Sequence, residues 1–271
     1  MSKGYLSPTE IAETTITTGI KKATQPSLNM LLLGIFAGIF ISIGAHADIT
    51  IMQTFKHVDV GVMKFLGGAV FPIGLVLVLV AGGELFTGNC LMTMALVDKK
   101  ITMKQMFKNW SLVYVGNFIG AMLFVFTVIK IGAYQEGTPA TELALSIATG
   151  KTTYSFGQVF LKGVFANVLV VLAVWIAYGA QDITSKIIGM WFPVMTFVML
   201  GFEHSIANMF FLPLAKFVGY DITWTQMFTR NIIPATLGNI VGGAIIIPLV
   251  YYVVYIIPKR KIKAKQLGKA A

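Results

Sequence analysis

Long runs of apolar residues, separated by short polar connections, make up most of the chain. Such a run can cross the hydrocarbon layer of a membrane when it supplies roughly 20 helical residues. The pattern predicts six spans, at residues 28–54, 65–97, 105–132, 157–180, 185–215 and 232–257. The runs are continuously apolar rather than alternating, which argues against a transmembrane β-barrel. We therefore expect an all-α membrane protein with a single transmembrane domain at residues 28–257.

The second and fifth spans are longer than one crossing needs, and each contains a polar interruption, at residues 83–89 and 201–208. In both interruptions a glutamate precedes an asparagine by five residues: Glu84 and Asn89 in the first, Glu203 and Asn208 in the second. An ionisable side chain in hydrocarbon is costly and usually faces a bundle interior or a polar cavity. We predict that both spans are broken helices, each with a non-helical loop that protein or a cavity covers.

The two halves of the chain repeat each other in the same order. Gly34 in the first span matches Gly163 in the fourth, the two interruptions match, and Asn117 in the third span matches Asn239 in the sixth. Each repeat contains three spans, an odd number, so the second repeat must be inverted relative to the first. The sequence thus predicts inverted three-helix repeats at about 28–132 and 157–257. Glycines expected to allow close helix packing are Gly34, Gly38, Gly116, Gly120, Gly238, Gly242 and Gly243.

Residues 1–27 are expected to form a cytoplasmic or interfacial segment. Ser7 is a candidate N-cap, Pro8 suits the first helical position, and Glu10 completes a capping box. This pattern predicts a short helix, although a partly ordered tail is the alternative. The apolar stripe expected to lie against the membrane surface is Ile11, Ile16 and Ile20.

Composition and charge fix the class and the orientation. Hydrophobic residues make up 56% of the chain and charged residues only 12%, which is too apolar for a soluble domain. The net charge of +10 is not a nucleic-acid signal, because 14 of the 21 Lys and Arg residues fall on the side of the membrane that holds both termini. The positive-inside rule then places both termini in the cytoplasm of a multi-pass cell-membrane (inner-membrane) protein, with residues 258–271 as a basic tail. The single cysteine, Cys90, excludes an intrachain disulfide and a cysteine metal cluster.

The breaks carry the candidate chemistry. A broken helix leaves unpaired N–H groups at the start of its second half, and these attract anions. We expect Glu84 and Glu203 to accept hydrogen bonds from loop N–H groups and hold the breaks open, with direct contact to a solute as the alternative. An imidazole ordinarily titrates near neutral pH, so His204 is a candidate for solute contact or proton exchange; a neutral core histidine is the alternative. Thr87 offers a further hydroxyl group. Five apolar side chains flank the breaks: Phe71, Leu75, Leu85, Phe86 and Phe197. They either form constrictions along a solute pathway or simply pack against neighbouring residues.

Over residues 5–257 the chain resembles the formate/nitrite transporter family, which includes formate, nitrite and hydrosulfide channels. The resemblance is carried by the motifs at residues 84–89, 109–110, 116–117, 166–167 and 201–210. It implies an aquaporin-like subunit with its own pore, assembled as a homopentamer around a central axis.

The same resemblance implies roles along one pathway. The constrictions would be Leu75 and Phe86 on the cytoplasmic side, with Leu85 in the adjoining loop, and Phe71 and Phe197 on the outer side. His204 would lie between them with Thr87 close by. Lys151 and Asn167 match a polar pair that raises the affinity for anions. Without the resemblance, Lys151 would be a solvated charge in the connection at 133–155.

An anion cannot cheaply cross an apolar ring, so the expected substrates are small monobasic acids: formate, nitrite or hydrosulfide. Lys151 would attract the anion, which takes up a proton from water or through His204 and passes as the neutral acid. After Thr87 the chain continues with Gly88-Asn89-Cys90, where classical formate channels have a serine-rich stretch, so the identity of the transported anion stays open.

The rival hypotheses are a neutral-solute channel of the aquaporin or ammonia type, an ion-coupled carrier and an intramembrane enzyme. Neither break has the Asn-Pro-Ala motif of aquaporins, and no zinc or nucleophile motif supports an enzyme, whereas a carrier stays open because it shares the sequence features of a channel. We expect no cofactor or metal, and we expect the anion, a proton and the lipid bilayer as partners.

Overall fold

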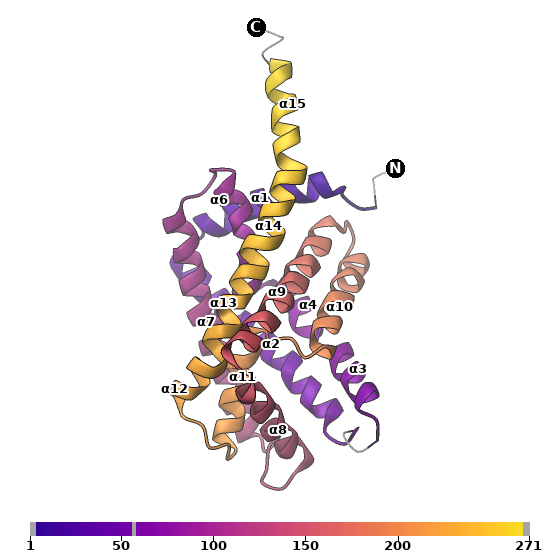
Figure 1. Ribbon diagram of the computed structural model, residues 1–271, viewed down its shortest axis with the longest axis vertical. Helices are drawn as coiled ribbons and strands as arrows, with labels where there is room; N and C mark the ends of the chain where they lie inside the picture. Colours follow the sequence, from indigo (N-terminus) through magenta and orange to yellow (C-terminus); the bar gives the residue numbers. More distant parts are fainter. Residues whose placement is uncertain (1–3, 56–57, 268–271) are drawn as a thin grey trace.

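The computed structural model describes residues 4–55 and 58–267, and within these residues it is helical, with no assigned strand. Figure 1 shows an elongated bundle in which both chain ends lie at the same end of the molecule. The only pairing of extended backbone among the described residues is an isolated bridge between Tyr5 and Ala180. The prediction of an all-α fold is confirmed.

The first repeat runs from a short helix across one end of the bundle to a long helix that returns through it. Its elements are α1 (Pro8–Thr24), α2 (Ser27–Met52), α3 (Val60–Val70), α4 (Ile73–Val76), a π-helical stretch (Leu77–Gly82), α5 (Phe86–Asn89), a 3-10 turn (Cys90–Met92), α6 (Thr93–Val97) and α7 (Met103–Lys130). The elements from α3 to α6 form the second span, which is broken before α5.

The second repeat follows the same order. Its elements are α8 (Pro139–Thr153), α9 (Phe156–Gly179), α10 (Ile183–Met199), α11 (Ser205–Phe217), α12 (Trp224–Met227), α13 (Ile233–Ile240), α14 (Ile247–Tyr251) and α15 (Ile257–Leu267). Short π-helical stretches join the last four into one helical run from α12 to α15. The fifth span is split between α10 and α11, each of which is too short to cross a membrane alone.

The inversion is visible in the placement of α1 and α8, which begin the two repeats and lie at opposite ends of the bundle (Figure 1). Both start with the same capping pattern: Ser7 before Pro8 in α1, and Thr138 before Pro139 in α8. In each repeat the first and third spans pack closely at glycines. A methyl group added at Gly120 would overlap the carbonyl oxygen of Ile35, and in the second repeat one at Gly242 would overlap that of Val164. The predicted packing role of these glycines is therefore confirmed.

Three predictions about the flanking segments need correction. The apolar stripe of α1 does not lie on the membrane surface, because Ile11 and Ile16 are buried against the protein. The connection at 133–155 contains the helix α8, which we missed because threonines and glycines interrupt its apolar pattern. The last span begins at Trp224, earlier than predicted, and the basic tail continues it as α15 up to Leu267.

Candidate functional site

The predicted breaks are confirmed, and each is preceded by a glycine that the backbone requires. Gly82 has φ +109° and Gly201 has φ +65°, and both values lie in the left-handed region that residues with a side chain rarely adopt. The chain then runs without helical hydrogen bonds until α5 begins at Phe86 and α11 begins at Ser205.

Two asparagines hold the breaks open. Asn117 accepts a hydrogen bond from the Phe86 backbone N–H at 3.0 Å through Oδ1, and its Nδ2 donates to the carbonyl oxygens of Gly34 and Glu84, both at 2.8 Å. Asn239 makes the same three bonds in the second repeat, to Ser205, Gly163 and Glu203. Buried loop groups need such partners because no water reaches them. The expectation that the glutamate carboxylates would bind the loop N–H groups is wrong.

The first glutamate instead lies in a ring of polar side chains. Glu84 Oε2 accepts from Lys22 Nζ at 2.8 Å and from Asn89 Nδ2 at 2.6 Å. Asn89 Nδ2 also donates to Asn109 Oδ1, and Asn109 Nδ2 donates to the carbonyl oxygen of Lys22. The ring neutralises the charge of Glu84 and ties α1 to the first break, because a buried charge needs a partner and hydrogen bonds.

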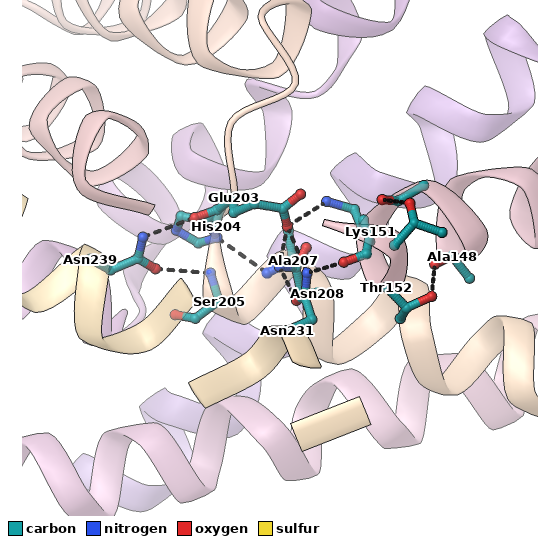
Figure 2. A network of polar contacts seen from close by, with 12 residues as sticks. Ala148, Lys151, Thr152, Glu203, His204, Ser205, Ala207, Asn208, Asn231 and Asn239 are labelled. Carbon is teal, nitrogen blue, oxygen red and sulfur yellow. Dashed lines mark hydrogen bonds and ion pairs between the residues drawn. The ribbon is translucent and has the colours of Figure 1, made fainter. Parts of the chain in front are cut away.

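The second glutamate repeats this ring (Figure 2). Glu203 Oε2 accepts from Lys151 Nζ at 3.0 Å, from Asn208 Nδ2 at 2.7 Å and from Asn231 Nδ2 at 3.1 Å. Asn231 Nδ2 also donates to the carbonyl oxygen of Lys151 at 3.0 Å. Lys151 is therefore not a solvated loop charge: α8 carries it to the second break, as α1 carries Lys22 to the first.

His204 joins the two breaks. Its Nδ1 accepts a hydrogen bond from the Ala207 N–H at 3.1 Å and so caps α11. Its Nε2 lies 2.8 Å from the hydroxyl oxygen of Thr87 in the other broken span. An Nδ1 that accepts leaves the ring proton on Nε2, so a neutral imidazole donates to Thr87. The ring is 2% exposed and stacks on Phe197, with centroids 5.7 Å apart.

Cavities lie on both sides of this contact. The larger, of about 440 Å³, is called the vestibule here and is lined by His204, Lys151, Phe71 and Phe197, among others. The rings of Phe71 and Phe197 meet edge to face at 5.8 Å. The smaller cavity, of about 10 Å³, is lined by Lys22, Leu75 and Leu85, among others. Each cavity therefore has a lysine and apolar side chains in its wall.

Four of the expected site residues line neither cavity: Thr87, which contacts His204, Glu84, which lies in the first ring, and Phe86 and Asn167. Phe86 is buried against the rings of Trp110 and Tyr114, at 5.8 and 4.9 Å, and does not line either cavity. Asn167 is fully buried, and its Nδ2 donates to the carbonyl oxygens of Thr87 and Asn239. The structure therefore does not bring Asn167 and Lys151 together as a pair.

The sequence contains a signal for the polar residues that we did not assign to the site. These residues are Lys22, Asn109, Asn117, Asn231 and Asn239. The four asparagines are amides inside apolar spans, and they pair across the repeats at one constant spacing, Asn109 with Asn231 and Asn117 with Asn239. Within the described residues, no group of three or more His, Cys, Asp or Glu side chains could hold a metal ion.

An inverted repeat whose broken helices meet at a buried polar contact, with a cavity on each side, defines a multi-pass membrane transport protein of the channel type. The sequence model of the family described as "Formate/nitrite transporter" matches residues 9–253. The chain belongs to this family.

Relatives and a solved structure agree with this assignment. The chain is 42% identical to the uncharacterized transporter YrhG of Bacillus subtilis, over 93% of this chain and 94% of that protein. It is 40% identical to the formate channel BtFdhC of Bacillus thuringiensis, over 92% and 95%. A solved structure described as a pentameric formate channel with formate bound is similar with a TM-score of 0.76 and 34% identity, over 85% of this chain and 98% of that one.

Proposed function

We propose that the protein is a channel for small monovalent anions of weak acids, with formate as the first candidate and nitrite and hydrosulfide as further ones. The observation that carries this proposal is the buried contact between His204 and Thr87, with a lysine-bearing cavity on each side. The relatives named or described as formate channels support formate for this chain. On this proposal the protein is not an enzyme.

Transient protonation fits the geometry of the pathway. Lys151 gives the vestibule a positive charge that attracts an anion, while Phe71 and Phe197 form an apolar constriction in its wall. An ion loses its hydration there without gaining equivalent partners, whereas the neutral acid loses far less. The anion therefore takes up a proton before the constriction and gives it up in the smaller cavity, which Leu75 and Leu85 line.

The hydrogen bonds of His204 favour water as the source of that proton. To carry a second proton on Nδ1, the imidazole would have to release the N–H group of Ala207 that it caps. A neutral His204 still fixes the orientation of the Thr87 hydroxyl group, because Nε2–H donates a hydrogen bond to its oxygen. The hydroxyl proton of Thr87 then points away from Nε2. His204 thus positions a hydrogen-bond donor for the solute between the two constrictions.

Orientation and assembly follow from charge and from the relatives. The end of the bundle that holds α1 and both chain ends carries most of the basic residues, so we place it in the cytoplasm of a bacterial-type inner membrane and the vestibule outside. The similar pentameric structure supports a homopentamer in which each subunit has its own pore.

The test is flux into liposomes that contain the purified protein, with formate, nitrite, hydrosulfide, glycerol and ammonia, from acid to neutral pH. We expect uptake of the weak-acid anions accompanied by protons, and no uptake of glycerol. His204→Phe should abolish the proton-coupled flux because it removes the donor to Thr87 and the cap of α11. His46→Gln, which removes an imidazole outside the pathway, is the matched control. Glycerol uptake by the wild-type protein would favour a neutral-solute channel instead.

A further inference from the structure

The vestibule contains a second carboxyl group that the proposed mechanism does not use. Asp48 lies on α2, near the end of the helix, lines the vestibule and is 4% exposed. Its Oδ1 is buried and has no hydrogen-bond partner among the described residues. An unpaired buried polar atom of this kind is rare and requires an explanation.

The packing around Asp48 leaves no room for a side chain at position 67 of α3. A methyl group added at Gly67 of α3 would overlap Asp48 Oδ1 and the side chain of Met52. The carboxyl group therefore lies against bare backbone on this side, while the vestibule is the open space beside it. Because Oδ1 lies against Gly67, a small molecule in the vestibule would meet the carboxyl group through its other oxygen, Oδ2.

The charged and titratable groups around Asp48 come from six segments of the chain. Lys151 of α8 and Tyr134 of the α7–α8 connection interact with it electrostatically, and His46 of α2 hydrogen-bonds to Tyr134 at 2.8 Å. The other such groups that line the vestibule are Lys64 of α3, Tyr154 at the end of α8, Lys162 of α9, and Glu203 and His204 at the second break.

Most of these charges already have partners. Lys151 pairs with Glu203, whose carboxylate accepts three hydrogen bonds, and Lys162 lies over the ring of Tyr154 at 3.6 Å. Three donors surround the carboxyl group of Glu203, whereas no hydrogen-bond donor among the described residues contacts Asp48 Oδ1. Of the two carboxyl groups, Asp48 is the one whose charge can change without breaking a hydrogen bond of the described residues.

We propose that Asp48 is a specificity-determining residue of the vestibule: its protonated carboxyl group donates a hydrogen bond to the small anion that Lys151 attracts, and its ionised form repels that anion. The inference rests on the proposed anion channel. On this inference the affinity of the vestibule for anions falls as the pH rises, because Asp48 ionises. The effect is independent of the protonation of the substrate.

A strong-acid anion separates these two sources of pH dependence. Nitrate stays ionised from acid to neutral pH, so a change in its inhibition constant, derived with the KM for formate measured at each pH, comes from the protein. Nitrate is added at the vestibule side of liposomes that contain the full-length protein. We expect its inhibition constant to be roughly tenfold higher at neutral pH than at acid pH, because one negative charge appears near the site.

Asp48→Asn keeps the size and a hydrogen-bond donor but cannot ionise. It should retain the acid-pH inhibition constant at every pH. Asp221→Asn, which removes an exposed carboxylate outside the vestibule, is the matched control and should keep the wild-type pH dependence. If the amide disrupts folding, Asp48→Ser carries the same expectation with a smaller neutral side chain.

Several outcomes would overturn the inference. Nitrate inhibition that does not change with pH in the wild-type protein would do so without any variant, as would a pH dependence that persists in Asp48→Asn or Asp48→Ser. A wild-type protein that takes up formate but is not inhibited by nitrate at acid pH also contradicts it. A wild-type protein that takes up no anion at all would instead refute the proposed function, and the inference with it.

Discussion

At the first break the helix restarts after Leu85, which has no capping side chain, whereas at the second it restarts after His204, whose imidazole caps it. Around this difference the two breaks are built alike. Each has a left-handed glycine, an asparagine that binds the loop from the third span of its repeat, and a lysine–glutamate pair. The scaffold is therefore duplicated, and the titratable group at the centre is not.

The comparison teaches that scaffold and chemistry are separable in this fold. The duplicated parts satisfy buried backbone groups and charges, which any break inside a membrane must do. The parts that differ lie where the breaks face each other and where the cavities differ in size. Variants at duplicated positions should therefore have equal effects in both repeats, and variants at unique positions should have unequal effects.

The largest effects are expected from Asn117→Leu and Asn239→Leu. Each removes three hydrogen bonds and leaves a buried loop N–H without an acceptor, and each such unpaired group costs about 1–3 kcal/mol. Thermal unfolding of the purified protein in detergent should show large and similar losses for both. Thr127→Val, which removes a hydroxyl bonded only within its own helix, should change little. A near-neutral result for either asparagine would refute the equivalence of the two scaffolds.

Intermediate effects are expected from Gly120→Ala and Gly242→Ala. The added methyl group would overlap a backbone carbonyl oxygen of the neighbouring helix, which cannot move aside as a side chain can, so each should cost about 1–3 kcal/mol. Gly150→Ala is the control, because it has open space around it in α8 and should stabilise by up to about 1 kcal/mol through helix propensity. The same unfolding assay measures all three variants. Unequal losses of stability for Gly120→Ala and Gly242→Ala would contradict the equivalence of the two repeats.

Effects on transport rather than on folding separate Lys151→Gln from Lys22→Gln, because each leaves a buried glutamate without its cation and should destabilise the fold to a similar extent. Both lysines pair with a buried glutamate, but Lys151 lines the larger cavity. Lys151→Gln should slow formate uptake from the vestibule side roughly tenfold at low salt, and Lys22→Gln should slow it less. The difference should shrink as salt is added. Lys104→Gln, at an exposed position of α7, is the control, and equal slowing by both pore lysines would contradict the asymmetry of the two ends.

The sequence by itself determined the membrane class, the breaks and the inverted repeat. Each of these can be recognised along the chain itself, as an apolar run, a glutamate five residues before an asparagine, or a motif that recurs at a nearly constant spacing. The capping box of α1 belongs here too, because Ser7 and Glu10 are one turn apart. Such patterns can be recognised in the sequence without knowing which residues pack against them.

Only the tertiary structure decided which groups meet. Thr87 and His204 are 117 residues apart, and Lys151 and Glu203 are 52 apart, so no local pattern pairs them. Whether a lysine is solvated or paired, whether the stripe of α1 meets lipid or protein, and whether Asp48 finds a partner depend on neighbours brought from other elements. Burial and hydrogen bonding are properties of that shared environment, and for this reason the chemistry of the pathway could not be read from spacing alone.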